Sequence, residues 1–475
     1  MKKLVALTMA TAMTLSLAAC GGASSSSAAA STATTDTASS AAESTASEAE
    51  DTITVMVPPV TNDYLDKMTE WADEFHEMYP NLTMEVIGTS WDDHTTKLST
   101  MAQAGEAPDI AEIAYAALAT YVENGTALNL SECMDKDQLA DFDQNALDYM
   151  TVENNVYGLP LYITIQALGA NKDMLEAAGV DVAKVQESGW TYDEFMEAIK
   201  NGTKDDTFGF VFANSGATAS DFLNIFGVSA GLNNAFNSDL KYEYTSTKML
   251  NLLTAVEEMT NSGYMPNYGV EASQRMVMCE TGNAMIFGKA MPLFENNINK
   301  NNAALEAKDG TAVENSIPVN YAFLPVPTMD GVTETCYGTV DGMVAFRNSN
   351  STDEHIQNVM KALYFLSSGE RAAYVDASTC LDGVCASARE ALASMDTGDR
   401  DQGNIDCAAR MIKTVVAPPT GITAEQTANA KQLMDEVIVP KFQALIAGET
   451  TAQAMYDEIV KQATAVFGED GCDLT

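Results

Sequence analysis

The chain has 475 residues, with 67 acidic against 25 basic side chains and a formal net charge of -42. Phosphate backbones are held by clustered Lys and Arg, so this charge excludes most nucleic-acid partners. Hydrophobic residues make up 46% of the chain, which is enough for a sizeable core, and the length favours two or three domains or one bilobed unit.

The N-terminus has the pattern of an export signal. Two lysines precede an apolar stretch, residues 4–19, which is shorter than the roughly twenty residues that a membrane span needs. The stretch ends in Leu-Ala-Ala before Cys20, which resembles the lipobox of bacterial lipoproteins. That resemblance predicts a signal peptide over residues 1–19 and lipidation of Cys20, whose two acyl chains give stable anchoring. A plain secretory signal is the alternative.

A spacer follows the signal. Residues 23–51 number 29, of which 24 are Ala, Ser or Thr and the other five are acidic. Such a segment cannot form a core, and as a flexible coil its ends lie on the order of 30 Å apart. We therefore expect residues 20–51 to tether an extracytoplasmic folded body to the outer face of the cell membrane.

The folded body opens with alternating strands and helices. Alternating apolar residues predict strands, helical spacing predicts the helices between them, and Asn62 or Asp63 can cap the first helix. The expected elements are a strand at 53–57, a helix at 65–78, a strand at 82–86, a helix at 91–104 and a strand at 109–113. This order is typical of a parallel sheet covered by helices, so the fold class is α/β.

Longer helices are predicted further along. Thr191 with Glu194 three residues later has the pattern of a capping box. Helical periodicity also covers residues 249–260, 354–366 and 423–466. Pro440 and Gly448 are expected to break the last of these segments. A second apolar run long enough to span a membrane is not found in the sequence.

Metal-binding motifs are lacking. His76, His94 and His355 lie far apart and none stands in a paired metal spacing, so we expect no metal and no cofactor. Seven cysteines remain besides Cys20, an odd number. A small-loop disulfide between Cys380 and Cys385 and buried free thiols are equally good interpretations.

One enzyme motif matches. Gly227 to Gly231 fits the GxSxG nucleophile elbow, with Ser229 as the nucleophile. The elbow needs a helix after the serine, but the following residues are rich in amides and lack apolar periodicity. A glycine-rich loop is therefore the preferred interpretation, and a secreted serine hydrolase is a minor alternative.

A series of short motifs is similar to that of family 1 extracellular solute-binding proteins. The matching segments are residues 71–75, 103–110, 157–160, 168–175, 191–195, 280–285, 324–327, 338–342 and 366–370. Ala170 stands where the family usually has Tyr. Each segment alone is a weak signal, but their shared order covers nearly the whole folded body.

This resemblance implies a two-lobed, maltose-binding-protein-like fold with a ligand cleft between the lobes. One lobe would comprise residues 52–162 and 322–371, and the other residues 168–318 and 376–475. The implied function is the substrate-binding lipoprotein of an ABC importer, which binds a carbohydrate by lobe closure and delivers it to the membrane permease. We expect a monomer without enzymatic activity.

Ligand contacts are expected at the carboxyl ends of strands and at the lobe interface. Aromatic rings stack on sugar faces, and carboxylates and amides bond sugar hydroxyls. The predicted ligand-binding residues are Trp91, Asp92, Glu112, Tyr115, Tyr162, Phe226, Phe287, Tyr337 and Asp341. The segment around Asp221, residues 216–234, is expected to form part of the cleft wall in the second lobe.

A second hypothesis keeps the receptor and changes the ligand. The acid excess suggests a cationic solute such as a polyamine, and the distinguishing feature is whether the cleft holds unpaired carboxylates.

Overall fold

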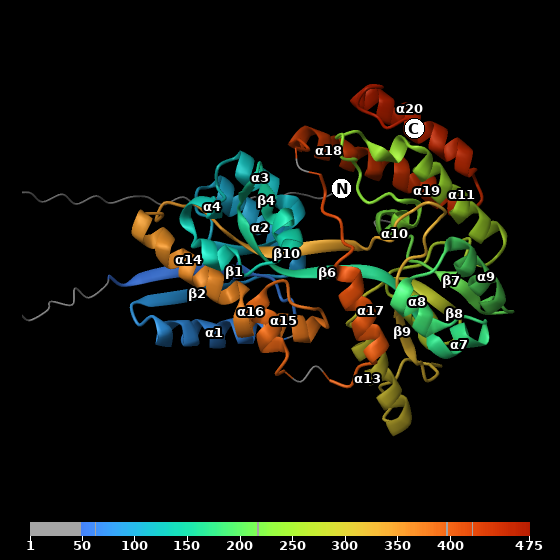
Figure 1. The fold of residues 1–475 in the computed structure, drawn as a ribbon, viewed down its shortest axis with the longest axis horizontal. Coiled ribbons are helices and arrows are strands. Elements are labelled where there is room, and N and C mark those ends of the chain that lie inside the picture. The colour runs from blue at the N-terminus through green and yellow to red at the C-terminus, as the bar shows by residue number, and fades with distance from the viewer. Residues whose placement is uncertain (1–48, 62, 216–217, 396–397, 420) are drawn as a thin grey trace, which may run out of the picture. The chain divides into compact units, whose positions relative to one another are not determined.

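The computed structural model describes residues 49–61, 63–215, 218–395, 398–419 and 421–475, and residues 49–475 form one body (Figure 1). The predicted signal peptide, Cys20 and nearly all of the tether lie outside the described residues. The first strand begins at Asp51, one residue inside the predicted tether, because the Asp51 side chain is bonded to the folded body.

The strands form one mixed sheet in the order β2-β1-β3-β10-β6-β8-β7, with β9 also pairing with β6, and β4 and β5 form a separate pair. Their bounds are β1 Asp51–Val57, β2 Leu82–Gly88, β3 Ile110–Ala114, β4 Thr151–Val152, β5 Asn155–Val156, β6 Gly158–Asn171, β7 Phe208–Val211, β8 Ala284–Ala290, β9 Tyr321–Leu324 and β10 Tyr337–Ala345. The expected parallel arrangement holds for β1, β2 and β3, whereas β10 runs antiparallel to both β3 and β6.

Helices cover the sheet, and α1 and α2 lie on opposite sides of β1 and β2 (Figure 1). The helices of the first half are α1 Tyr64–Met78, α2 Trp91–Gln103, α3 Leu118–Glu123, α4 Leu130–Cys133, α5 Lys136–Leu139, α6 Gln144–Leu147, α7 Lys172–Ala177, α8 Val182–Ser188, α9 Tyr192–Gly202 and α10 Thr218–Gly227. Those of the second half are α11 Thr247–Asn261, α12 Gln274–Glu280, α13 Phe294–Ala307, α14 Asp353–Ser367, α15 Gly369–Thr379, α16 Ala386–Leu392, α17 Gln402–Ile412, α18 Ala424–Leu433, α19 Val439–Ile446 and α20 Ala452–Phe467. Short helical turns are η1 Tyr115–Ala117, η2 Asp148–Met150, η3 Val228–Ala230, η4 Glu243–Thr245 and the π-helical η5 Met434–Ile438.

Strand β6 connects the two halves of the sheet. Its first residues pair with β10, from Gly158 to Gln166, and its last residues pair with β8 and β9. Most of its side chains are buried, as expected for a strand covered on both faces. The chain therefore passes from one half of the body to the other along one continuous strand.

Helix boundaries follow local chemistry. The Thr191 capping box is present, since its hydroxyl accepts from the Glu194 amide and the Glu194 carboxylate accepts from the Thr191 amide. Asp63 occupies the N-cap position of α1 but makes no side-chain capping bond. The α-helix is interrupted near both predicted positions: the π-helical turn η5 separates α18 from α19 just before Pro440, which lies in the first turn of α19, and α19 ends at Ile446, before Gly448.

A charged cluster fastens α14 to the first strand. The Nδ1 atom of His355 lies 2.9 Å from Asp51 and its Nε2 atom 3.0 Å from Asp109 Oδ1. Burial opposes the charged imidazole, but the hydrogen bonds to Asp109 and Asp51 outweigh burial and raise the pKa of His355. Both ring nitrogens therefore act as donors, which requires the protonated form.

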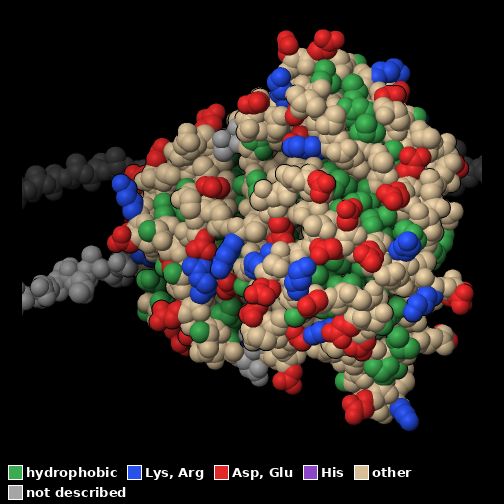
Figure 2. Space-filling model, turned by 45° about the vertical axis from the view of Figure 1, so that its right-hand side comes forward, with side chains coloured by type: hydrophobic (Ala, Val, Ile, Leu, Met, Phe, Trp, Pro, Cys, Tyr) green, Lys and Arg blue, Asp and Glu red, His purple; other side chains and the backbone are tan. Residues whose placement is uncertain are grey.

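The described chain holds seven cysteines, all of them free thiols and six of them buried, so Cys380 and Cys385 are not joined. Within the same residues no helix combines the length and apolarity that a bilayer crossing requires. Acidic side chains are spread over the face shown in Figure 2, among fewer Lys and Arg. The acid excess is thus distributed over this face rather than gathered in one patch.

Candidate functional site

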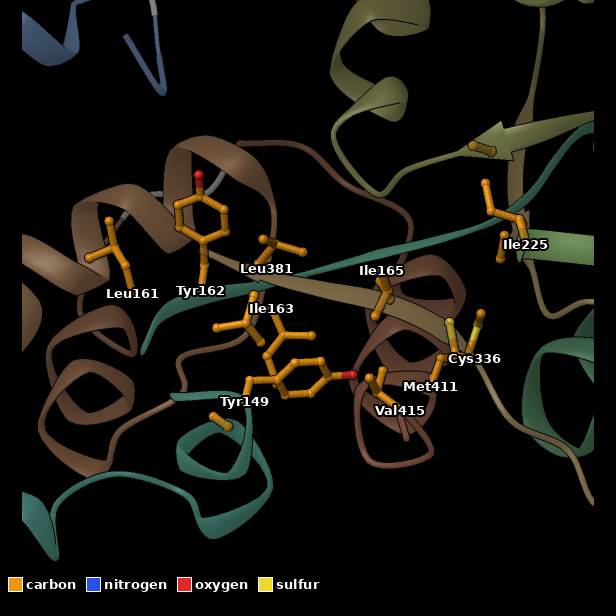
Figure 3. Close-up of a cluster of buried hydrophobic side chains, with 14 of the residues drawn as sticks. Tyr149, Leu161, Tyr162, Ile163, Ile165, Ile225, Cys336, Leu381, Met411 and Val415 are labelled. Atoms are coloured by element: carbon orange, nitrogen blue, oxygen red, sulfur yellow. The ribbon is translucent and has the colours of Figure 1, made fainter. Parts of the chain in front are cut away.

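The two strands at the centre of the sheet carry a row of polar side chains on one face. In the antiparallel register of β6 and β10, Tyr337 pairs with Gln166, Thr339 with Thr164, and Asp341 with Tyr162. The residues between them, Ile163, Ile165 and Val340 among them, are fully or almost fully buried. Figure 3 shows Tyr162 on the opposite side of β6 from Ile163 and Tyr149. This alternation gives the connecting strands one apolar face and one hydrogen-bonding face.

Three tyrosines, Tyr115, Tyr149 and Tyr337, meet around one cavity near the start of β10. Tyr115 follows β3 in η1 and Tyr149 lies in η2, and their rings meet edge to face with centroids 4.9 Å apart. Burial, reinforced by the neighbouring phenols, raises the pKa of Tyr149 and of Tyr337. All three therefore stay neutral phenols, which can donate a hydrogen bond and present an aromatic face or edge.

Amide side chains reach the same place from α10 and from the loop after η3. The Tyr244 hydroxyl donates to Asn224 Oδ1 at 2.9 Å, and a hydrogen bond from Asn224 partly offsets the burial that raises the pKa of Tyr337. Asn233 accepts from the Thr335 hydroxyl at 2.7 Å and Asn234 donates to the Ala417 carbonyl at 3.4 Å.

A small cavity marks the meeting point of these groups. Its lining is Tyr115, Tyr149, Val228, Asn233, Asn234, Cys336, Tyr337, Gly338 and Val416. The cavity volume is about 10 Å³, which is the space of a single water molecule. Within the described part of the chain, the buried Tyr149 hydroxyl and Gln166 Oε1 have no hydrogen-bond partner. Unpartnered buried polar atoms of this kind need an outside partner, such as water or a ligand hydroxyl.

Three larger hollows lie elsewhere and suit a ligand less well. One, of about 400 Å³, has mostly polar and acidic residues around it, a second, of about 1050 Å³, runs along α13 and α15, and a third, of about 340 Å³, lies between the start of β1 and α14. The ring in the largest one, Tyr374, already packs on Trp71 and under Lys67, and its hydroxyl is bonded to Asp63. None of the three hollows has more than one tyrosine in its lining, whereas the small cavity has three together with amides.

Three predicted site residues form a buried acidic network at one end of the polar row. The Tyr162 hydroxyl donates to Glu112 Oε1 at 3.1 Å, and Asp341 pairs with Tyr162 across the strands. Burial and the nearby Asp341 raise the pKa of Glu112 well above its usual value, and burial raises that of Asp341. Both carboxyls are therefore protonated more readily in the folded protein than they would be in water. They serve as hydrogen-bonding groups rather than as fixed charges.

Phe226 and Phe287, predicted as ligand contacts, lie instead in the core. Phe226 is fully buried, with its ring 5.5 Å from both Phe210 and Phe222. Phe287 is fully buried on β8 and stacks on Phe294 with centroids 6.2 Å apart. Strand β8 is covered on both faces and α10 turns Phe226 inward, so neither ring reaches the cavity, and we leave both out of the proposed site.

The remaining predictions are placed as follows. Tyr115 and Tyr337 line the cavity. Trp91 and Asp92 are the first two residues of α2, and their side chains lie outside the described part of the structure. Residues 216 and 217 of the predicted wall also lie outside it, whereas Asp221 and Asn224 on α10 approach Tyr337.

Tyr149, which lines the cavity, was not predicted. Gln166, which pairs with Tyr337, and Tyr244, which donates to Asn224, were not predicted either. Asn224 itself falls within the predicted wall, residues 216–234. One signal was available in the sequence, because polar residues at every second position interrupt an otherwise apolar strand from Tyr162 to Gln166. Tyr149 and Tyr244 give no such signal, since each lies in a short turn that only the tertiary structure brings to β10.

The GxSxG segment does not form a nucleophile elbow. It continues the end of α10 into η3 rather than joining a strand to a helix. Ser229 is fully buried, and its hydroxyl has no hydrogen-bond partner among the described residues. A catalytic serine needs an exposed hydroxyl beside a base, so this geometry does not support the hydrolase alternative. No group of three or more His, Cys, Asp or Glu within the described residues is arranged to hold a metal ion.

Solved structures share this fold. An ABC substrate-binding protein of Listeria monocytogenes in complex with cycloalternan matches with a TM-score of 0.63 at 17% identity, covering 88% of this chain and 99% of that one. The cyclic α-maltosyl-1,6-maltose binding protein of Arthrobacter globiformis matches at 0.67 and 15% identity, with 88% and 99% covered. A cyclo/maltodextrin-binding protein complexed with maltotetraose matches at 0.65 and 18% identity, with 88% and 98% covered. The fold is thus the two-lobed α/β fold of periplasmic binding proteins.

Sequence comparison defines the family. Residues 59–369, more than half of the chain, match the bacterial extracellular solute-binding protein family, and the chain belongs to that family. A lipoprotein of Streptomyces antibioticus is 29% identical over 140 residues, which are 30% of this chain and 31% of that protein. The maltodextrin-binding protein of Bacillus subtilis is 22% identical over 236 residues, 49% of this chain and 47% of that protein. The chain thus matches less than half the length of these curated relatives.

Proposed function

We propose that this protein is the extracytoplasmic receptor of an ABC importer and binds a neutral oligosaccharide at the cavity beside β6 and β10. The observation that carries the proposal is the convergence of Tyr115, Tyr149 and Tyr337 with Asn233 and Asn234, the amides of the loop after η3, around one cavity. Phenol rings and amides are the groups that bind sugar faces and hydroxyls. The proposed role of the site is to bind the oligosaccharide and release it unchanged.

The charges around the cavity favour a neutral ligand over a polyamine. The Asp221 carboxylate is paired with Lys289 at 2.6 Å, and the raised pKa values of Glu112 and Asp341 disfavour their charged forms. A polyamine site needs unpaired carboxylates. The described carboxylates near β6 and β10 do not supply them.

Ligand entry requires the lining to separate. A cavity of about 10 Å³ cannot hold a sugar, since small-molecule sites span roughly 300–1,000 Å³. We propose that the two parts of the lining belong to two lobes, residues 52–162 with 322–371 and residues 168–318 with 376–475. The lobes then open around the connecting strands to admit the ligand and close on it.

Attachment to the membrane is proposed through Cys20. The lipobox-like sequence and the Ala/Ser/Thr-rich tether support this, as does the similarity to a Streptomyces lipoprotein. The wild type should incorporate labelled palmitate, and the Cys20→Ala variant should not. Unchanged labelling of the variant would contradict attachment through Cys20.

The ligand class is tested by thermal shift on the purified protein with a panel of neutral sugars. The neighbouring structures were solved with α-glucan oligosaccharides, so maltotetraose and cyclic maltodextrins come first. A ligand at one hundred times its Kd should stabilise the folded state by about 2.7 kcal/mol. No shift with any sugar, together with a salt-sensitive shift with spermidine, would overturn the assignment.

A further inference from the structure

Lys289 adopts a backbone conformation that side-chain-bearing residues rarely take. It lies near the end of β8 with φ of +52°, in the left-handed region. The preceding Gly288 has no room for a side chain, since a Cβ there would lie 1.8 Å from the Phe212 ring. Strand β8 is thus packed against Phe212, and its backbone turns out of register at the next residue, since Gly288 pairs with Leu168 and Ala290 with Ala167 of β6.

A buried arginine holds this turn in place. Arg275, on α12, is 7% exposed, and its guanidinium donates to the Gly288 carbonyl at 3.1 Å and the Lys289 carbonyl at 3.2 Å. It also donates to the carbonyl of Ala272. An irregular backbone that is overdetermined in this way is characteristic of functional positions.

Lys289 pairs with an aspartate on the helix that leads into the cavity lining. Lys289 Nζ lies 2.6 Å from Asp221 Oδ2, and the two side chains are 26% and 28% exposed. Asp221 is one turn before Asn224 on α10, and Asn224 accepts a hydrogen bond from Tyr244. Helix α10 runs directly into η3, where Val228 lines the cavity, so the ion pair lies on the same helix that reaches the proposed site.

We propose that the Lys289–Asp221 pair determines the charge selectivity of the site, an inference that rests on the proposed sugar-binding function. The ammonium keeps further N–H donors and the carboxylate keeps further acceptors, so together they bond adjacent neutral hydroxyls. A carboxylate on the ligand is repelled by Asp221, and an ammonium is repelled by Lys289. A partly exposed ion pair such as Lys289–Asp221 contributes little to the stability of the folded protein. Stabilisation by this pair therefore does not account for the free-energy cost of the strained backbone at Lys289.

The test measures binding by isothermal titration calorimetry with three probes that share one backbone. These are maltotetraose and maltotetraose carrying either carboxylates or amines at C6. The proteins are the wild type, Asp221→Asn, Lys289→Met, the double variant, and Lys461→Met, which removes a more exposed ion pair with Glu458 on α20. Circular dichroism checks that each variant folds.

Opposite changes are expected from the two single variants. Asp221→Asn should bind the neutral probe about tenfold more weakly and should gain affinity for the carboxylated probe. Lys289→Met should lose the same affinity for the neutral probe and should gain affinity for the aminated probe. The double variant should lose both charge preferences, and Lys461→Met should behave as the wild type. A different result is that the wild type binds none of the three probes while the single variants gain binding of the charged ones. That result would refute the neutral-sugar assignment, but it would still support a position of the ion pair at the ligand site. Variants with the wild-type charge preference, or variants that bind no probe, would overturn the role of the pair.

Discussion

The Tyr337 side chain connects both parts of the site, because it lies on β10 and lines the cavity together with Asn233 and Asn234. Tyr337→Phe removes only the hydroxyl, so we expect about five- to tenfold weaker binding of the sugar with little change in thermal stability. Calorimetric titration measures this effect. Tyr268→Phe, at a tyrosine 52% exposed, is the matched control, and equal affinities for both variants would place Tyr337 outside the site.

Glu112 makes stability depend on pH in an unusual direction. Its pKa in the folded protein is raised well above the ordinary value of 4.5, by burial and by Asp341, so above pH 4.5 the folded state holds a proton that the unfolded state releases. Its contribution to stability is therefore greatest below pH 4.5 and declines as pH rises toward the folded-state pKa.

Glu112→Gln should reduce that decline. Urea unfolding at pH 5 and pH 8 should give a smaller loss of unfolding free energy for the variant than for the wild type. Glu85→Gln, at an exposed position of β2, should leave the pH difference unchanged. A variant with the full wild-type difference would mean that Glu112 ionises normally in the folded protein.

The sequence predicted which kinds of amino acid form the site more readily than it predicted their positions in the chain. The expectation of tyrosines and acids near strand ends led to Tyr115, Tyr162, Tyr337, Glu112 and Asp341, which all lie at the crossing strands. Phe226 and Phe287 failed because hydrophobic spacing does not tell an inward ring from one at a cleft. Tyr149 and Tyr244 could not be found, since nothing local marks a turn that folding brings to a distant strand.

At the scale of elements, the His355 cluster joins α14 to β1 and to the start of β3. The pKa of His355 is raised above its ordinary 6.5, so its stabilising charge is fully present below pH 6.5 and is lost as pH rises through the folded-state pKa. His355→Gln should therefore lower the unfolding free energy by about 2 kcal/mol at pH 5.5 and by less at pH 8.5.

Chemical denaturation at the two pH values tests this cluster. His76→Gln, at an exposed histidine of α1, controls for the loss of an imidazole. A His355 variant destabilised equally at both pH values would show that the imidazole is neutral and acts by packing alone.

The order of the secondary-structure elements was predictable because hydrophobic periodicity and helix-capping residues are local features of the sequence. The strand and helix alternation up to β3 and the Thr191 capping box were correct. The antiparallel strand β10 was not foreseen, since it returns from far along the chain to lie between β3 and β6. The α-helix is interrupted before Pro440 as predicted, but the π-helical turn that interrupts it could not be read from the sequence.

For the whole molecule, the central claim is that a neutral oligosaccharide binds at the crossing strands. The acid excess bears little on this, because the carboxylates near the cavity are paired or have raised pKa values. The family membership and the fold follow from comparison, whereas the ligand and its position are proposals. Both depend on the same tyrosines.

The most direct measurement is calorimetric titration of maltotetraose and cyclic maltodextrins into the wild type and into Tyr115→Ala/Tyr337→Ala. At least one of these sugars should bind the wild type with little dependence on salt, and the double variant should bind it at least a hundredfold more weakly while staying folded. Equal affinity for both proteins, or binding of spermidine in place of every sugar, would contradict sugar binding at the crossing strands.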